Sequence, residues 1–197
     1  MNARLQIALV LLAVFALGAL VVAARIEDGD DPGIAVFEGS KLPEGLPAPL
    51  FSLKNQDGAR VNMASLGGSP VVVTFLYSNC EDTCPLQAQT VKGALNDLEE
   101  DVPALAISVD PARDTPDSAR RFLSEQRMTG RMDFVLGTRL QLQAIWTGYA
   151  IRPQSVREEH TGRFVLVDKR GRQRIGFPLN QATPERLAHD LRILLAE

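Results

Sequence analysis

Residues 71–85 read VVVTFLYSNCEDTCP, and this stretch holds both cysteines of the 197-residue chain, Cys80 and Cys84. Its first six residues form a continuous apolar, β-branched run, which is typical of a central strand buried on both faces. The turn that follows carries the cysteines. Because ligands in open α/β sheets bind beyond the carboxyl ends of the parallel strands, the sequence predicts a functional site at this turn.

Strand and helix patterns alternate on both sides of the cysteine turn. The predicted elements are a hairpin at 50–63, the strand 71–76, a helix after Cys84, a strand at 102–109, a helix at 116–127, a strand at 132–136, a helix at 140–149, a hairpin at 164–177 and a last helix from 183. Thr115 and Pro116 suit the N-cap and the first residue of a helix. This order predicts an α/β domain whose sheet has parallel members and flanking helices, with antiparallel strands added by the last hairpin.

An apolar segment precedes this domain. No charged side chain occurs from residue 7 to 24, and with Leu5 and Gln6 the segment reaches the roughly 20 residues that span a bilayer as a helix. Arg4 lies before it and several acidic residues follow it, so the positive-inside rule places the C-terminal bulk outside the cytoplasm. We therefore expect a cytoplasmic stub at 1–4, a transmembrane anchor at 5–24 and a periplasmic domain on a bacterial inner membrane. A cleaved signal peptide is the alternative, because residues 22–24 are small.

Residues 25–45 are rich in proline, glycine and acidic residues, which predicts a flexible linker and leaves 46–197 as one domain. The chain is 45% hydrophobic and has a formal net charge of −3. This composition suits a globular protein and provides no basic field, so we expect no nucleic-acid partner.

The spacing of Cys80 and Cys84 limits their chemistry. At the start of a helix, residues four apart share one face, with Cβ atoms about 5–6 Å apart. A disulfide needs about 3.5–4.5 Å, so it would require a non-helical turn at residues 81–83. Two thiolates on one metal tolerate a wider separation, since each metal–sulfur bond is about 2.3 Å long. The spacing therefore favours a metal over a disulfide.

The residues around the thiols also bear on this choice. Amides at a helix N-terminus lower the pKa of a nearby thiol, whereas Glu81 and Asp82 oppose a thiolate and favour a cation. Soft thiolate ligands select Cu(I), and an added histidine could accommodate Cu(II). The alternative is that both cysteines are small buried hydrophobic residues, because they continue the apolar stripe of the following helix.

Two histidines are available as a third ligand. His189 lies off the leucine stripe of the last helix, which predicts a solvated surface residue. His160 ends a polar stretch shortly before the strand predicted at 164–167, so a loop could bring it to the cysteine turn. As a lone residue, His160 is more often an ordinary loop histidine, which is the alternative. With the two cysteines it would supply three ligands, whereas structural zinc sites close with four.

Three segments together resemble a known family. They are VTFLYSNCEDTCP at 73–85, ISVDPARDTP at 107–116, and His160 ahead of FVLVD at 164–168. They resemble the Sco/SenC family of copper-binding assembly proteins, and the resemblance covers most of residues 45–197. It implies a thioredoxin-like sheet behind one membrane helix, with Cys80 and Cys84 as thiolate ligands and His160 as the third ligand to Cu(I) and Cu(II).

The resemblance further implies delivery of copper to the binuclear copper centre of cytochrome c oxidase. The expected partner is the copper-centre subunit of the oxidase, besides other periplasmic copper chaperones or thioredoxin-like reductases. A metallochaperone is thus expected rather than an enzyme. The alternatives are a thiol–disulfide oxidoreductase that uses Cys80 and Cys84 on a partner's cysteines, and a copper-responsive signalling protein.

Overall fold

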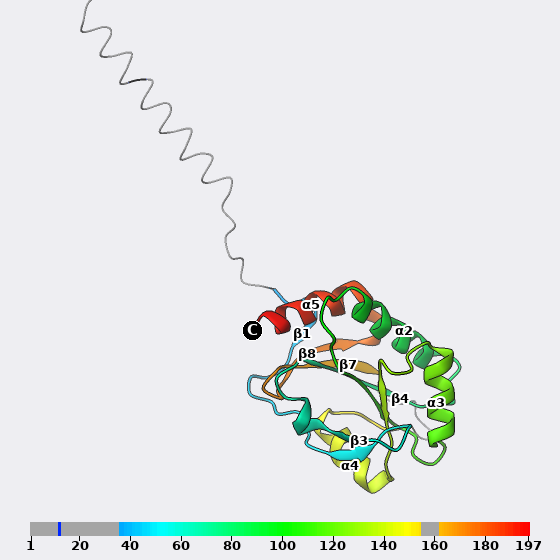
Figure 1. Ribbon diagram of the computed structural model, residues 1–197. Helices are drawn as coiled ribbons and strands as arrows, with labels where there is room; N and C mark the ends of the chain where they lie inside the picture. The colour runs from blue at the N-terminus through cyan, green and yellow to red at the C-terminus, as the bar shows by residue number, and fades with distance from the viewer. Residues whose placement is uncertain (1–11, 13–35, 155–161) are drawn as a thin grey trace, which may run out of the picture. The chain divides into compact units, whose positions relative to one another are not determined.

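A mixed sheet with β4 near its centre organises the domain (Figure 1). Its strands lie in the order β1-β8-β7-β4-β5-β6. Their bounds are Ser40–Lys41 (β1), Val71–Leu76 (β4), Ala104–Ser108 (β5), Asp133–Val135 (β6), Arg163–Val167 (β7) and Gln173–Pro178 (β8). β4 pairs parallel to β5 and antiparallel to β7. Every residue of β4 is buried, as its unbroken apolar run predicts.

Helices cover both faces of this sheet. Their bounds are Thr83–Asn96 (α2), Pro116–Glu125 (α3), Arg139–Gly148 (α4) and Pro184–Ala196 (α5), with short 3₁₀ turns at Met63–Leu66 (η1) and Leu179–Gln181 (η2). α2 and α5 lie on one face and α4 on the other (Figure 1). A hydrophobic core lies on each face of the sheet, and successive side chains of β4 point alternately into the two cores. Val72 and Leu76 pack with α2 and α5, whereas Val73 and Phe75 pack with α4.

Threonines cap three of these helices. The Thr115 hydroxyl accepts the Ser118 N–H at 3.1 Å, and Pro116 is the first residue of α3, as predicted. Thr138 and Thr183 cap α4 and α5 in the same way. Each cap satisfies an amide that the helix itself leaves without a partner, so these helix starts are defined locally.

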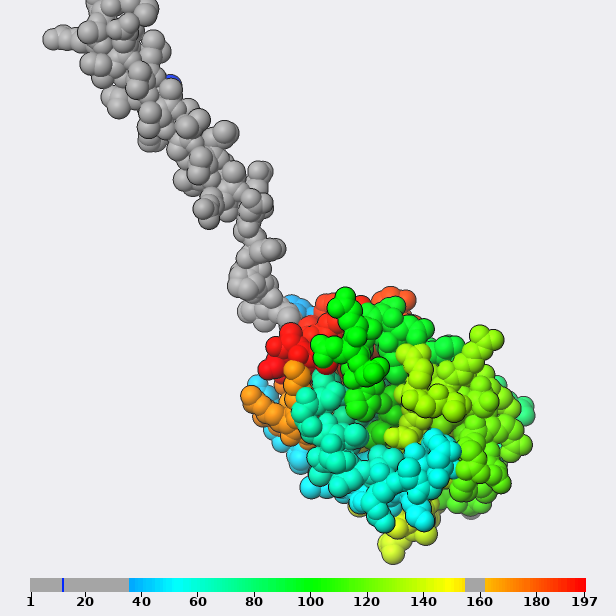
Figure 2. Space-filling view, viewed as in Figure 1, coloured from blue at the N-terminus to red at the C-terminus, as the bar shows by residue number. Residues whose placement is uncertain are grey.

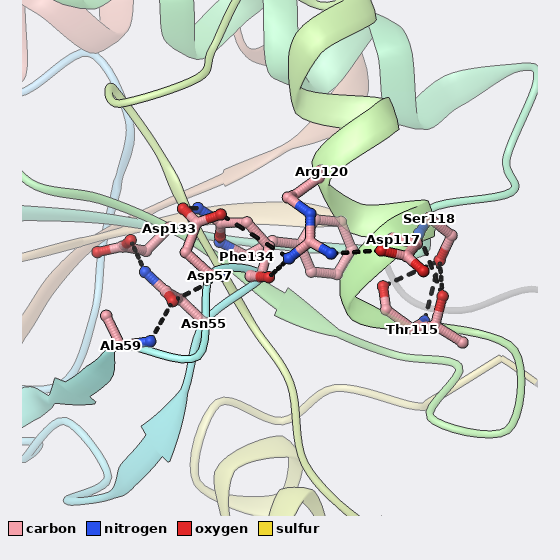
Figure 3. A network of polar contacts seen from close by, with 10 residues as sticks. Asn55, Asp57, Ala59, Thr115, Asp117, Ser118, Arg120, Asp133 and Phe134 are labelled. Carbon is pink, nitrogen blue, oxygen red and sulfur yellow. Dashed lines mark hydrogen bonds and ion pairs between the residues drawn. The ribbon is translucent and has the colours of Figure 1, made fainter.

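The predicted first hairpin consists of β2 (Ser52–Lys54) and β3 (Arg60–Asn62), paired apart from the main sheet. Side chains of its turn attach it to the sheet edge (Figure 3): Asn55 donates to Asp133 at 2.7 Å, and Gln56 accepts the Phe134 N–H at 2.8 Å. Arg120 of α3 donates to the Gln56 carbonyl. In the space-filling view the cyan hairpin accordingly lies against the yellow-green residues around β6 (Figure 2).

The N-terminal boundary of the domain differs from the prediction. Strand β1 pairs with β8, and the buried carboxylate of Asp190 in α5 accepts the N–H groups of Glu38 at 2.8 Å and Gly39 at 2.9 Å. The compact unit starts at Phe37. Residues 37–45 therefore belong to the domain, and the prediction of a linker through residue 45 was wrong at its C-terminal end.

The computed structural model describes residues 12, 36–154 and 162–197. Within these ranges no helix has the length and apolar character needed to cross a membrane. The predicted stub at 1–4 and, apart from Leu12, the predicted anchor at 5–24 lie outside the described residues, as does His160.

Candidate metal centre

The cysteines lie where β4 ends and α2 begins. Residues 77–82, which we call the motif turn, connect the two elements, and the Cys80 N–H donates to the Tyr77 carbonyl at 3.3 Å. Cys84 is the second residue of α2, but Cys80 precedes the helix. The turn thus carries Cys80, as predicted, and α2 begins one residue before Cys84 rather than after it. Both are free thiols in this structure.

The sulfur of Cys80 takes the place of a helix cap. Asp82 occupies the N-cap position of α2, yet its side chain makes no capping hydrogen bond. The Cys84 N–H donates instead to Cys80 Sγ, with a nitrogen–sulfur distance of 3.4 Å. Negative charge on this sulfur is favoured, because the N-terminus of a helix carries positive charge from its unpaired amides.

The two thiols differ in acidity. Burial alone would raise the pKa of Cys80, but hydrogen bonds from the Cys84 thiol and the Tyr77 hydroxyl outweigh it and lower that pKa below its ordinary value. Burial, followed by the hydrogen bond to Cys80, raises the pKa of Cys84. The hydrogen bond to Cys80 and then burial raise the pKa of Tyr77, so its hydroxyl stays protonated as a donor. The pair therefore favours a thiolate at Cys80 and a proton on Cys84.

The surroundings of the two thiols bear on two expectations, one about charge and one about burial. Glu81 and Asp82 are exposed, and the hydrogen bonds at Cys80 lower its pKa although two carboxylates stand next to it. Cys84 is fully buried in the apolar core, as the hydrophobic interpretation predicts, while Cys80 is 7% exposed and lines a surface groove. Both cysteines nevertheless belong to the buried core cluster around α2 and α5, as the hydrophobic interpretation predicts.

Gln87 of α2 faces the sheet although it is a polar residue. Its side chain is 2% exposed, and the hydroxyl of Thr74 in β4 lies 2.9 Å from Gln87 Oε1. The helix thus turns a wider face to the sheet than its apolar residues alone indicate.

Asp114 holds the motif turn in place, and residue chemistry alone did not reveal this role. Its Oδ1 accepts both the N–H and the hydroxyl of Ser78 at 2.7 Å, and its Oδ2 accepts the Ser108 hydroxyl at 2.5 Å. Burial raises the pKa of Asp114, and the donors at Ser108 and Ser78 oppose that rise. One carboxylate therefore ties the motif turn to the end of β5. The sequence contained one signal for this contact. Ser78 and Asp114 each follow a predicted strand, and the carboxyl ends of parallel strands lie at the same edge of a sheet.

A second contact joins the same two segments. The Arg113 guanidinium lies over the Tyr77 ring, 5.9 Å from its centroid, and pairs with Asp110. The segment ISVDPARDTP therefore touches the motif turn at Ser78 and at Tyr77. The second and first segments of the family resemblance are neighbours in space.

The predicted third ligand, His160, lies outside the described residues. Its flanks are described: the Gln154 N–H donates to the Val109 carbonyl at 3.0 Å, and Phe164 in β7 is paired with Thr74 in β4. The flanks of segment 155–161 thus lie at the sheet edge where β4 ends. Across the described part of the chain, no three His, Cys, Asp or Glu side chains gather in a way that could hold a metal. The His189 side chain is 46% exposed, as predicted for a surface residue.

Comparison with known proteins gives a consistent result. The SCO1/SenC family model matches residues 43–196. Protein SenC of Rhodobacter capsulatus is 32% identical over 149 residues, which cover 70% of this chain and 66% of that protein. Protein SCO1 homolog 1 of Arabidopsis thaliana is 28% identical over 145 residues, covering 72% of this chain and 43% of the relative. The match to the SCO1 protein homolog of Bacillus subtilis covers 52% of that protein. The chain therefore spans about half the length of the Arabidopsis and Bacillus relatives.

Solved structures agree with this match. The structure of Bradyrhizobium japonicum ScoI with copper bound has a TM-score of 0.61 and 30% sequence identity, and the alignment covers 75% of this chain and 99% of that one. BsSco, described as a member of the Sco family of cytochrome c oxidase assembly proteins, has a TM-score of 0.69 and 23% identity, covering 80% and 98% of the two chains. Together with the observed topology, this likeness confirms the predicted thioredoxin-like α/β fold.

Proposed function

The chain belongs to the SCO1/SenC family, and from that premise we propose that it is a membrane-anchored copper metallochaperone. Cys80 and Cys84 bind Cu(I) through their sulfurs, and His160 completes the site, above all for Cu(II). Support comes from the copper-bound relative and from one observation in this chain: Cys80 Sγ lies among the Cys84 N–H, the Cys84 thiol and the Tyr77 hydroxyl. That arrangement stabilises the anionic ligand that copper requires.

The residues of the turn have separate tasks in this proposal. Cys80 offers a thiolate, whereas Cys84 gives up its proton when the metal binds, since a coordinating sulfur must be deprotonated. Asp114 fixes the position of Ser78, two residues before Cys80, and so orients the turn. The burial of Cys84 keeps water from one side of the thiol pair. A disulfide between the two cysteines is the oxidised, metal-free state.

The proposal extends to location and recipient. Residues 5–24 anchor the protein in the bacterial inner membrane, and the domain faces the periplasm, as the charge pattern around that segment indicates. The recipient is the binuclear copper centre in the copper-centre subunit of cytochrome c oxidase. Supporting this choice, BsSco is described as a member of a family of oxidase assembly proteins.

Deletion of the gene tests this function. We expect oxidase activity to fall in the deletion strain, to return with added copper, and to return with the parent gene but not with Cys80→Ala. His160→Ala should restore less activity than the parent, while His189→Ala, on the exposed face of α5, should restore it fully. Undiminished oxidase activity in the deletion strain would contradict the proposed recipient.

A second function has its own support. A lowered pKa at Cys80 beside a buried, raised-pKa Cys84 also suits a thiol–disulfide oxidoreductase, in which one thiol attacks and the other resolves the mixed disulfide. This alternative predicts reduction of a partner's disulfide without metal and little effect of His160→Ala. The copper proposal predicts the opposite on both counts.

A further inference from the structure

A groove runs beside Cys80, between the motif turn and α3. Its volume is about 230 Å³. It is lined by Ser78, Asn79, Cys80, Glu81, Pro85, Arg121, Phe122, Glu125 and Gln126. Cys84 does not contribute to the lining and is fully buried. A molecule in the groove would therefore meet the sulfur of Cys80 and not that of Cys84.

The groove carries four exposed charged side chains without ion-pair partners among the described residues. Glu81, Arg121 and Glu125 line it, Asp82 adjoins Glu81, and all four side chains are exposed. In the part of the chain that the structure describes, the four side chains form no ion pair with one another or with other residues. Three carboxylates against one guanidinium give the groove a negative field, which favours a basic ligand.

An exposed leucine directly follows Pro85, which lines the groove. Leu86 is 68% exposed in the first turn of α2. Gln89, three residues later, donates to the Gln126 carbonyl at 2.9 Å and so faces α3. Since residues three apart share one face of a helix, Leu86 also lies on the α3 side. It offers an exposed apolar side chain beside the groove residue Pro85.

We propose that the groove docks a segment of a partner polypeptide in which one cysteine is flanked by a basic residue and an apolar residue. The cysteine faces Cys80, the basic residue meets Glu81 and Glu125, and the apolar residue covers Leu86. The inference rests on the proposed function, in which a partner's sulfur must approach the thiol pair to receive copper. It adds which surface the partner uses and what that partner presents.

Two synthetic peptides test this docking. Each carries one leucine and one cysteine activated as a mixed disulfide with thionitrobenzoate, and the remaining flanks are lysines in one peptide and glutamates in the other. The Cys80 thiolate attacks the peptide sulfur, forms a Cys80–peptide disulfide and releases the thionitrobenzoate anion, whose absorbance gives the rate. The full chain is used in its reduced, metal-free form in detergent. The rate of each peptide with the protein is divided by the rate of the same peptide with 2-mercaptoethanol, which corrects for the intrinsic reactivity of the peptide.

The ratio of the two normalised rates reports docking, because the reacting atoms are the same. At low salt we expect the lysine peptide to react about tenfold faster than the glutamate peptide. Glu125→Lys should bring the ratio close to one, whereas Glu99→Lys, an exposed acid away from the groove, should leave it unchanged.

The apolar contact has its own test. Leu86→Ser should slow both peptides about fivefold. Leu140 is 86% exposed in α4, and Leu140→Ser should slow neither peptide.

An unchanged ratio in Glu125→Lys, or an equal loss in Glu99→Lys, would overturn the docking surface. Equal rates for Leu86→Ser and Leu140→Ser would overturn the apolar contact. A separate copper titration of the parent protein distinguishes the two proposals: failure to bind copper contradicts the proposed function, whereas indifference to the peptides with normal copper binding contradicts the docking surface alone.

Discussion

Cys80 and Cys84 are both buried but differ in their hydrogen bonding, although only three residues separate them along the chain. Cys80 is 7% exposed and accepts hydrogen bonds at the start of the helix, whereas Cys84 is fully buried. The sequence predicted that both residues carry the chemistry. It did not predict their difference, because the Tyr77 hydroxyl and the helix amide reach Cys80 only through the three-dimensional path of the motif turn.

Tyr77→Phe tests the hydrogen bond to Cys80. Loss of a hydrogen bond to a charged group costs about 1.5–3 kcal/mol, which corresponds to about one to two pKa units. The midpoint of the pH dependence of Cys80 alkylation should therefore move upward, and alkylation at neutral pH should slow. Iodoacetamide labelling of the reduced, metal-free protein, followed by mass spectrometry, measures both effects.

Tyr149→Phe is the matched control. The Tyr149 hydroxyl is buried without a hydrogen-bond partner among the residues that the structure describes, and Tyr149 packs in the core on the other face of β4. This variant should leave the alkylation midpoint where it is in the parent. Equal midpoints in Tyr77→Phe and the parent would show that the Tyr77 hydroxyl does not stabilise the thiolate.

At the scale of elements, most strands and helices were predicted within a few residues of their observed bounds. The buried run of β4, the two hairpins and the threonine caps have strong local signals. β1 was missed because it has two residues and no alternating pattern, and its position depends on pairing with β8. The role of Asp114 was missed because its partner Ser78 lies 36 positions earlier in the chain, in the motif turn.

Asp114→Asn should destabilise the junction between the motif turn and β5. An amide replaces one acceptor oxygen by a donor, so at least one of the hydrogen bonds from Ser78 or Ser108 is lost, at a cost of about 1–3 kcal/mol. Urea unfolding measures this loss, with Asp117→Asn in the exposed first turn of α3 as the control. If the two variants unfolded at the same urea concentration, Asp114 would not hold the junction.

Asp168 gives the β7–β8 turn a pH dependence. Burial would raise its pKa, but the N–H groups of Arg172 and Arg170, each at 2.9 Å, and the Arg174 guanidinium lower it below the ordinary value. Because the folded-state pKa lies below the unfolded one, this stabilisation is present above the unfolded value of about 3.9 and is lost as the pH falls through the folded pKa.

The corresponding prediction is that Asp168→Asn lowers the free energy of unfolding more at pH 7 than at pH 3. Urea unfolding at the two pH values measures the difference, and Glu99→Gln on the exposed surface serves as control. A penalty for Asp168→Asn that is the same at both pH values would contradict the ionic role of Asp168.

The folded domain begins further toward the N-terminus than the composition of the sequence indicates. Asp190 is fully buried, and its carboxylate depends on the N–H groups of Glu38 and Gly39. A chain starting at residue 46 would leave this carboxylate without those donors and would uncover the edge of β8. A chain starting at residue 37 keeps both contacts. The acidic, glycine- and proline-rich composition of 25–45 concealed this boundary.

We expect the chain 46–197 to be less stable than the chain 37–197 by more than about 1–3 kcal/mol, the cost of one unsatisfied buried donor or acceptor. Thermal unfolding compares the two chains. In the shorter chain, Asp190→Asn should recover part of this loss, because it removes the buried carboxylate that has lost its two donors. Equal stability of the two chains would place the domain boundary at residue 46 after all.

In the proposed function, Cys80, Cys84 and His160 form one copper site. Titration of the reduced full chain with Cu(II), followed by the thiolate-to-copper absorption, tests it most directly. We predict one equivalent bound by the parent and by His189→Ala, no thiolate band in Cys80→Ala or Cys84→Ala, and weaker binding in His160→Ala. If the cysteine variants and His160→Ala bound Cu(II) as tightly as the parent and with the same spectrum, the site would lie elsewhere.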